Sequence, residues 1–244
     1  MGRKWNNIKN KKGAQDKARG QVYTRLLRYV TKAVKSGGEH PEANFLLGIA
    51  LEKCRVNNVP KDNIERAIKK GLGNDDDGYN DMNYEGYGIN GVAIFIEAST
   101  NNPTRTASNI RNCFTKCGGA LGTTGCLQFV FEHKAVFEIP EKIVTNEDDF
   151  SLEVIDAGAD DIQKEDGHII ITGPMANFGP IQKKLQDLKV KVEEAALERV
   201  PLNFKEVDPD TFKSIMKLVD MLEADDDVNK VYHNIQYDEV FLND

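Results

Sequence analysis

One short stretch decides how the middle of this 244-residue chain folds: Val92-Ala93-Ile94-Phe95-Ile96-Glu97. The stretch is almost entirely apolar and is rich in β-branched residues. Such a run is typical of a central strand whose two faces are both covered. We therefore expect a sheet with this strand near its centre and other elements packed on it.

The residues around the stretch supply these elements. Tyr84-Glu85-Gly86-Tyr87-Gly88 predicts a partner strand, joined to the first by a glycine-bearing turn at 89–91. Further along, the sequence predicts a helix from Pro103 to Gly118, a strand at 127–131, a helix from Asp208 to about Leu222 and a strand at 228–235. The last two elements can complete the sheet that residues 82–131 begin.

Residues 134–199, which lie between these parts, have an order of elements of their own. A hairpin turn at Asp166-Gly167 separates two strand patterns. The expected elements are strands at 135–139 and 168–171, helices near 147–157 and 174–188, and a strand at 190–197. The order β-α-β-β-α-β is that of a ferredoxin-like unit.

The N-terminal third predicts helices. Residues 22–34 carry apolar side chains with a period of 3.6, and Gly37-Gly38 ends this pattern. Pro41 and Pro60 suit the starts of two more helices, the second stopping at Gly71. Three short amphipathic helices can bury their apolar stripes against one another, which predicts a three-helix bundle.

Together these patterns predict the α+β class, with an N-terminal three-helix bundle followed by two ferredoxin-like α+β domains, the third inserted in the second. The expected parts are a basic arm at 1–20, the bundle at 21–72, a discontinuous domain at 80–132 plus 200–238, and the inserted domain at 133–199. The glycines and the Asp75-Asp76-Asp77 run between bundle and sheet predict a linker.

Charge is divided unevenly along the chain. The net charge is −7, but residues 1–35 contain eleven Lys or Arg and one acid, Asp16, so that segment carries +10 and the rest −17. This division indicates that one end of the protein meets a polyanion. We expect a cytoplasmic protein, because the chain lacks a membrane-length apolar run and a secretory signal, and its four cysteines have no Cys-x-x-Cys spacing.

Chemistry-bearing motifs are missing from the sequence. The glycine-rich stretch 118–125 follows a helix and lacks the Gly-Lys-Ser/Thr ending of a phosphate loop, so it predicts a helix cap and a turn. The four histidines, at positions 40, 133, 168 and 233, show no ligand spacing. We therefore expect no enzyme activity, no catalytic residues, no cofactor and no metal site.

Several stretches carry a family resemblance. They are Gly2-Arg3-Lys4-Trp5-Asn6-Asn7-Ile8-Lys9, Asn58-Val59-Pro60-Lys61-Asp62-Asn63-Ile64-Glu65-Arg66-Ala67-Ile68, Tyr84-Glu85-Gly86-Tyr87-Gly88, Asn102-Pro103-Thr104-Arg105-Thr106, Lys116-Cys117-Gly118-Gly119-Ala120-Leu121-Gly122 and Ala224-Asp225-Asp226-Asp227-Val228-Asn229-Lys230-Val231-Tyr232-His233-Asn234. In this order they resemble the YebC/PmpR family, which includes the mitochondrial translational activator of cytochrome c oxidase subunit I.

The resemblance implies a three-domain architecture and a non-enzymatic role in gene expression. Some family members are described as DNA-binding transcriptional regulators, and others resemble translation factors for ribosomes stalled at proline-rich sequences. Many members have other residues where this chain has Arg3 and where it has Ile89-Asn90. These two differences bear on the subgroup of the family to which the chain belongs. The role of the acidic triplet 225–227, in turn formation or partner contact, is left open.

The basic end is the predicted nucleic-acid-binding site. Its candidate residues are Arg3, Lys4, Trp5, Lys9, Lys11, Lys12, Lys17, Arg19, Arg25, Arg28, Lys32 and Lys35. Cations of this kind neutralise phosphates. Trp5 can stack on an unpaired base or pack on the bundle.

Three partners are compatible with this site. The ribosome or ribosomal RNA is favoured, because the acidic domains would repel a long duplex laid across them. Duplex DNA is the alternative, since the third helix offers polar residues for reading bases. A protein-only interaction module is the second alternative, no membrane partner is expected, and the oligomeric state is left open.

Overall fold

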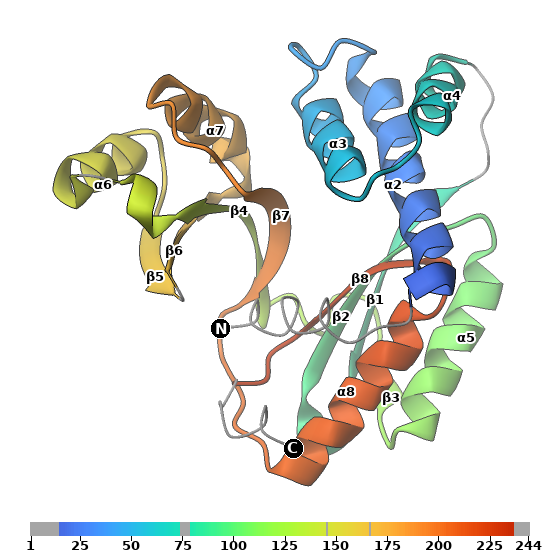
Figure 1. Ribbon diagram of the computed structural model, residues 1–244. Coiled ribbons are helices and arrows are strands. Elements are labelled where there is room, and N and C mark those ends of the chain that lie inside the picture. Colours follow the sequence, from blue (N-terminus) through green and yellow to red (C-terminus); the bar gives the residue numbers. More distant parts are fainter. Residues whose placement is uncertain (1–14, 74–78, 145, 166, 237–244) are drawn as a thin grey trace. The chain divides into compact units, whose positions relative to one another are not determined.

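The computed structural model describes residues 15–73, 79–144, 146–165 and 167–236 (Figure 1). The chain divides into two compact units, the first made of residues 1–131 with 201–244 and the second of residues 132–200. Each unit contains a four-stranded sheet and helices, so the predicted α+β class is confirmed. None of the described helices is long and apolar enough to cross a membrane.

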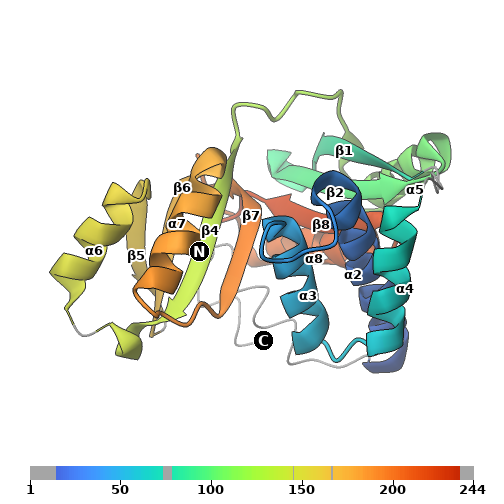
Figure 2. The same cartoon turned by 90° about the horizontal axis from the view of Figure 1, so that it is seen from above.

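The first unit begins with three helices, α2 (Gln15–Gly37), α3 (Phe45–Val56) and α4 (Lys61–Leu72), which Figure 2 shows from above. Their shared core includes Leu26 and Val30 of α2, Leu47 of α3 and Ala67 of α4. The predicted apolar face of residues 22–34 is thus the buried one. Helix α2 starts earlier than that pattern indicates, because residues 15–19 are mostly strong helix formers.

Asn44 joins the first two helices and sets where α3 begins. Its side-chain oxygen accepts a hydrogen bond from Leu47 N at 3.1 Å, as an N-cap does. Its Nδ2 donates to the carbonyls of Ala33 and Gly38, both at 2.7 Å. Because this cap is in place, α3 starts after Asn44, whereas Pro41 lies in the preceding turn, contrary to the predicted start.

The first sheet contains β1 (Asn80–Tyr87), β2 (Ala93–Thr100), β3 (Ala120–Leu121) and β8 (Val228–His233) in the order β3-β1-β2-β8. Strands β1 and β2 form the predicted hairpin, and β8 pairs antiparallel with β2. Nearly every residue of β2 is buried, which confirms the doubly covered central strand. Residues 120–121 pair with Gly86 and Tyr87, so the predicted turn in this region contains a two-residue strand.

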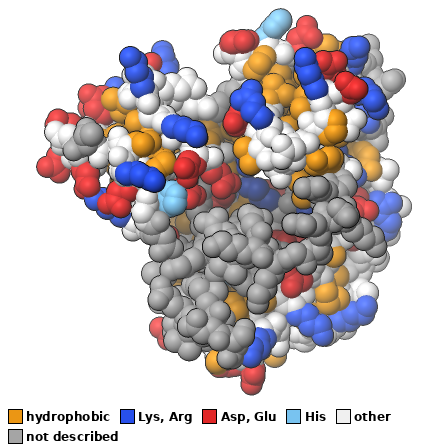
Figure 3. Space-filling model, viewed as in Figure 1, with side chains coloured by type: hydrophobic (Ala, Val, Ile, Leu, Met, Phe, Trp, Pro, Cys, Tyr) orange, Lys and Arg blue, Asp and Glu red, His pale blue; other side chains and the backbone are white. Residues whose placement is uncertain are grey.

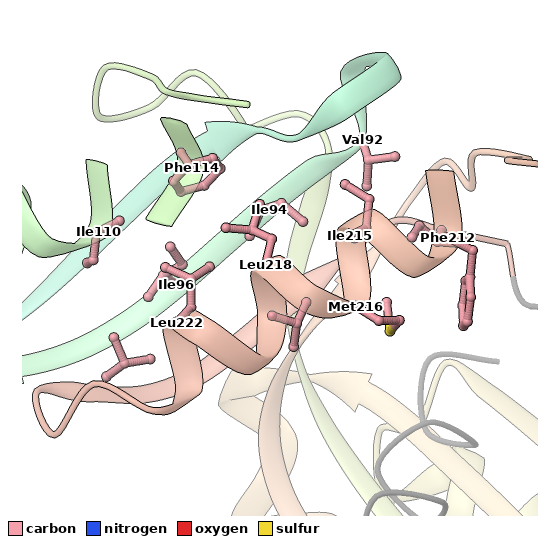
Figure 4. Packing of buried hydrophobic residues seen from close by; sticks show 13 residues of the cluster. Val92, Ile94, Ile96, Ile110, Phe114, Phe212, Ile215, Met216, Leu218 and Leu222 are labelled. Carbon is pink, nitrogen blue, oxygen red and sulfur yellow. The ribbon is translucent and has the colours of Figure 1, made fainter. Parts of the chain in front are cut away.

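Two helices cover one face of this sheet, α5 (Pro103–Lys116) and α8 (Pro209–Glu223). In Figure 4, Ile94 and Ile96 of β2 point towards Phe114 of α5 and Leu218 of α8. The carboxyl end of the chain therefore supplies a large share of this core, as the pairing of α8 and β8 with residues 82–131 predicts.

The opposite face of β2 is covered by residues 126–131. Ala93 and Phe95 pack there against Leu127 and Phe131, both buried. The prediction of a strand at 127–131 is wrong: the backbone forms successive turns, with Val130 N donating to Leu127 O at 2.9 Å. The buried residues are four apart, which is the spacing of a helical turn, while Phe129 between them is 78% exposed.

The second unit contains β4 (Phe131–Pro140), α6 (Glu147–Asp156), β5 (Asp161–Glu165), β6 (His168–Pro174), α7 (Phe178–Asp187) and β7 (Glu194–Pro201). The strand order is β5-β6-β4-β7, which is that of a ferredoxin-like unit. Phe137 of β4 packs against Phe178 of α7, with the ring centroids 4.5 Å apart. This contact places α7 on the face of β4 to which Phe137 points.

Helix α7 starts later than predicted. Strand β6 extends to Pro174, which pairs with Lys134, and a short 3-10 turn follows before the helix begins at Phe178. Pro180 explains the late start, because proline lacks an N–H and is tolerated only in the first turn of a helix. A helix starting at Pro174 would place Pro180 in its second turn.

Candidate nucleic-acid interface

The predicted arm lies mostly outside the described residues. This applies to Arg3, Lys4, Trp5, Lys9, Lys11 and Lys12. Lys17 and Arg19 belong to the first turns of α2, and their side chains also lie outside the description. The described part of the predicted interface therefore consists of four cations on α2, which are Arg25, Arg28, Lys32 and Lys35.

Arg25 caps the carboxyl end of helix α8. Its Nη2 donates to the carbonyls of Glu223 at 2.6 Å and Asp225 at 3.0 Å. The last carbonyls of a helix have no partners inside it and carry the negative end of the helix dipole, so a guanidinium is favourable there. Burial lowers the pKa of Arg25, although Glu223 opposes this effect. Arg25 is thus held inside its own unit.

Arg28 continues the same contact one turn along α2. Its Nη1 donates to the carbonyl of Asp226 at 3.1 Å, and its Nη2 donates to the hydroxyl of Tyr79 at 3.2 Å. The guanidinium carbon also lies 4.3 Å from the centre of the Tyr79 ring, a cation–π geometry. Sequence reasoning grouped Arg28 with the nucleic-acid ligands, and the structure gives it partners on two other segments.

The remaining two cations line a pocket of about 180 Å³ in the first unit. Lys32 forms a salt bridge with Asp81 there. Burial lowers the pKa of Lys32, while Glu97 raises it. Burial also raises the pKa of Tyr29 to about 12, with Glu97 adding to the shift and Arg25 opposing it. The full lining consists of Arg25, Arg28, Tyr29, Thr31, Lys32, Lys35, Tyr79, Asn80, Asp81, Ser99 and Asn229.

Chemically, the pocket combines cations with hydroxyl and amide groups. These groups are suited to phosphate and sugar oxygens, and two tyrosine rings stand among them. Sequence reasoning found the four cations from their helical spacing. Three further pocket residues were not predicted. Asp81 lies in β1, Asn229 lies in β8, and Tyr79 directly precedes β1. Their distance from α2 in the sequence gives no indication that they contact it.

The acidic triplet Asp225-Asp226-Asp227 forms the turn between α8 and β8. Asp227 is 4% exposed, and its Oδ2 accepts from Arg105 at 2.6 Å, Thr106 at 2.8 Å and Thr100 at 3.2 Å. Burial alone would raise the pKa of Asp227, but the hydrogen bonds from Arg105 and Thr106 lower it. Of the two roles left open for the triplet, the structure supports turn formation. The hydrogen bonds from Arg105 and Thr106 also attach the start of α5 to this turn.

The Tyr84–Gly88 motif has a structural role of the same kind. Glu85 is 6% exposed, and its carboxylate accepts from the backbone N–H groups of Gly125 at 2.9 Å and Leu127 at 2.6 Å. A Cβ on Gly86 would lie 2.7 Å from the carbonyl oxygen of Ala120. Only glycine allows β3 to approach β1 this closely, so the motif shapes the sheet.

A second basic surface lies on the bundle. Helices α3 and α4 are joined by a short turn in which Asn58 adopts a φ of 54°. The exposed cations of α4 are Lys61, Arg66, Lys69 and Lys70, and the exposed acids Asp62 and Glu65 lie on the same side of the helix, with Lys61 Nζ 3.8 Å from Glu65 Oε1. We call the four cations the α4 basic face. Two helices joined in this way resemble a helix-turn-helix, in which the second helix meets the nucleic acid.

The fold and this interface define a class of proteins: a helical bundle with a basic surface, followed by two α+β parts of which one is inserted in the other. The chain belongs to the TACO1/YebC family. Residues 3–74 match the family model described as the TACO1/YebC protein N-terminal domain, and residues 79–235 match the one described as the TACO1/YebC second and third domain.

Relatives and a solved structure agree with this assignment. A "Probable transcriptional regulatory protein" of Parabacteroides distasonis is 40% identical over 239 residues, covering 98% of each chain. One of the same description from Treponema denticola is 42% identical over 239 residues, covering 98% of this chain and 96% of its own. The crystal structure of a conserved hypothetical protein, Aq1575 from Aquifex aeolicus, has a TM-score of 0.80 at 36% identity and covers 93% of this chain and 95% of its own.

Proposed function

We propose that this protein is a non-enzymatic, nucleic-acid-binding regulator of gene expression that acts as a translation factor on the ribosome or its RNA. The observation that carries this proposal is the division of charge, +10 in residues 1–35 and −17 in the rest of the chain. A ribosome factor needs only a local basic end that enters folded RNA, while acidic surfaces can face basic ribosomal proteins. The names of the relatives support regulation of gene expression.

The contacts of Arg25 and Arg28 refine which residues bind. Both donate to backbone carbonyls at the α8–β8 turn, so their first role is to hold α2 in place. We assign the nucleic-acid contacts mainly to the arm, with Lys17 and Arg19 at its junction with α2, and to Lys32 and Lys35 in the pocket. The relief of stalling at proline-rich sequences rests on the family resemblance.

The test is binding to purified ribosomes by co-sedimentation, beside binding to duplex DNA at the same salt concentration. We expect ribosome binding to weaken steeply as salt rises, because each neutralised phosphate releases a counterion. A protein lacking residues 1–14 should lose binding and still unfold cooperatively, because the described core of the bundle is made of residues from Val22 onward. Full binding by the shortened protein would contradict the proposal.

The alternative is a DNA-binding transcriptional regulator, and the α4 basic face favours it. A base-reading helix should discriminate between sequences by roughly 1–3 kcal/mol per good contact. Reversing Lys61 and Arg66 to Glu would then abolish sequence-specific binding to duplex DNA. On the translation reading, duplex DNA sequences are hardly distinguished and the same variant still sediments with ribosomes.

A deletion strain separates the two functions in the cell. Ribosome profiling beside RNA sequencing should show increased pausing at proline runs, restored by the full-length protein but not by one lacking residues 1–14. Unchanged pausing, together with promoter occupancy and altered transcript initiation, would favour the DNA function. If neither ribosomes nor DNA bind, the protein-only interaction module takes precedence.

A further inference from the structure

We propose that Glu138, His168 and Glu193 form a binding site for a first-row divalent cation, with Zn²⁺ as the best fit, on the sheet of the second unit. One ligand atom from each side chain lies within 4.8 Å of the other two. His168 Nε2 is 3.1 Å from Glu193 Oε2, and its Nδ1 is 4.0 Å from Glu138 Oε1. On the face shown in Figure 3, a histidine lies beside acidic side chains over this unit.

The backbone brings the three residues together from distant parts of the sequence. Antiparallel pairing of β4 with β6 sets His168 opposite Pro140, two residues from Glu138. Diagonal neighbours of this kind share a face and lie within reach of long side chains. Glu193 N donates to Glu138 O at 2.8 Å, which holds the third residue beside β4.

The site lies on the face of the sheet away from α7. Phe137 packs against Phe178 of α7, and successive side chains of a strand point to opposite faces. Glu138 therefore points away from that helix. Its side chain is only 12% exposed, against 34% for His168 and 44% for Glu193. The cluster thus has one nearly buried ligand and two that a cation can reach from solvent.

The charges of the cluster favour a divalent cation. Two carboxylates converge on one imidazole, and the imidazole can supply at most one positive charge. A bound divalent cation would neutralise both carboxylates, and it would hold the imidazole in its neutral form. Binding of the cation would also relieve the repulsion between the two carboxylates.

The ligand types select among cations. One imidazole nitrogen with two carboxylate oxygens suits Zn²⁺ and its first-row neighbours, whereas Mg²⁺ and Ca²⁺ prefer oxygen ligands alone. Bonds of about 2.0–2.2 Å in a tetrahedral site require the ligand atoms to lie roughly 3.4 Å apart, so the glutamates would close in slightly. Three protein ligands leave a position for water. The site would tie β4, β6 and the segment before β7 together.

The test is Zn²⁺ binding to the full chain after removal of metal with a chelator. Isothermal titration calorimetry should show one Zn²⁺ per chain. Affinity should fall at least about tenfold in H168Q and in E138Q, since each loses a ligand. H40Q is the matched control, because His40 is an exposed histidine in a turn of the first unit. It should bind as the unchanged protein does.

Two further measurements make the outcome decisive. Circular dichroism melting of the metal-free proteins shows whether H168Q and E138Q are folded, and E193Q, at the most exposed ligand, provides a variant that does not disturb the strands. The absorption spectrum of the Co²⁺-loaded protein identifies the ligands. A thiolate charge-transfer band would assign the metal to the cysteines and overturn the proposal. So would Zn²⁺ binding that is unchanged in the folded ligand variants, or absent from the unchanged protein.

Discussion

At the scale of single residues, the polar side chains that resemble a family signature hold the fold together. Asp227 contacts Arg105 and Thr106 although it lies more than 120 positions from both in the chain. Each motif was visible in the sequence, but the contact between them was not. Nothing in the order of residues indicates that the N-terminal end of α5 packs against the turn after α8. The hydrogen bonds between Glu85 and the backbone of Gly125 and Leu127 could not be predicted for the same reason.

Replacing Asp227 with Asn should lower the free energy of unfolding by about 2–3 kcal/mol, because buried hydrogen bonds to a charged group are lost. Asp226 is exposed, and D226N should change it by less than about 0.5 kcal/mol. The effect should fade in acid: the folded pKa of Asp227 is lowered, so its contribution is present above its unfolded pKa and is lost as the pH falls through the folded value. Urea unfolding curves measure the difference, and equal curves for the two variants would refute it.

His233 should make the protein sensitive to acid. Burial lowers the pKa of His233 to about 4. Its Nδ1 lies 3.3 Å from Ile235 N, and accepting that hydrogen bond also requires the neutral ring. An unfolded histidine takes up a proton below about pH 6.5, so the unfolded state binds more protons and stability falls between about pH 6.5 and 4.

The loss over that range should reach up to about 3 kcal/mol. In H233N, whose amide oxygen can accept the same hydrogen bond, the stability curve should be flatter by this amount. Urea unfolding at several pH values gives both curves, and the difference between them removes the contribution of the carboxylates. Parallel curves would show that His233 titrates normally.

At the scale of elements, hydrophobic period and caps predicted most helices and strands. The hairpin around residues 89–91 and the helix from Pro103 are examples. The failures have local causes. Residues 127–131 look like a strand because they are apolar, but only every fourth side chain is buried. In the candidate site only the α2 cations were predicted, because Asp81, Ser99 and Asn229 of the pocket come from three separate strands.

Gly71 marks a close approach between two helices. A Cβ there would lie 2.7 Å from the carbonyl oxygen of Thr31 and 2.7 Å from Val34 Cβ, both of α2. Replacing it with Ala should destabilise the bundle by about 1–3 kcal/mol, because backbone must move. Gly48 in α3 is the control, because a Cβ there would lie 3.8 Å from the nearest atom, the carbonyl oxygen of Pro41, which is an ordinary contact distance.

In G48A the added methyl fits, and the higher helix propensity of Ala should stabilise by roughly 0.5–1 kcal/mol. Thermal unfolding followed by circular dichroism compares the two variants. Opposite signs are expected, and a shift to lower melting temperature in both would mean that steric contact is not what distinguishes the two positions.

At the scale of the whole molecule, the second unit is inserted between residues 131 and 201 of the first unit, which lie close together. Leu202 N donates to Val130 O at 2.8 Å, so the entry to residues 132–200 lies beside the exit. Replacing those residues with a short Gly-Ser linker should leave the first unit folded, because little loop-closure entropy is added. Its core comes from β2, α5 and α8, which all remain.

Circular dichroism and urea unfolding test this prediction. The shortened protein should unfold in one cooperative transition, and the far-ultraviolet spectrum should retain its helical character. Loss of cooperativity would mean that the first unit depends on the inserted one for its stability.

The insertion also determines an order of events during synthesis. Helix α8, which covers β2, begins at Pro209, and strand β8, which pairs with β2, begins at Val228, so both leave the ribosome after the whole second unit. A nascent chain therefore carries the apolar face of β2 uncovered while residues 132–200 already have all that their own core requires. The second unit can therefore fold first, while the sheet of the first unit still has an unpaired edge at β2. Unpaired strand edges in incompletely folded chains promote aggregation. The dependence on a late C-terminal segment makes premature termination between Thr100 and Val228 costly, because every such fragment contains β2 but lacks the strand that pairs with its edge.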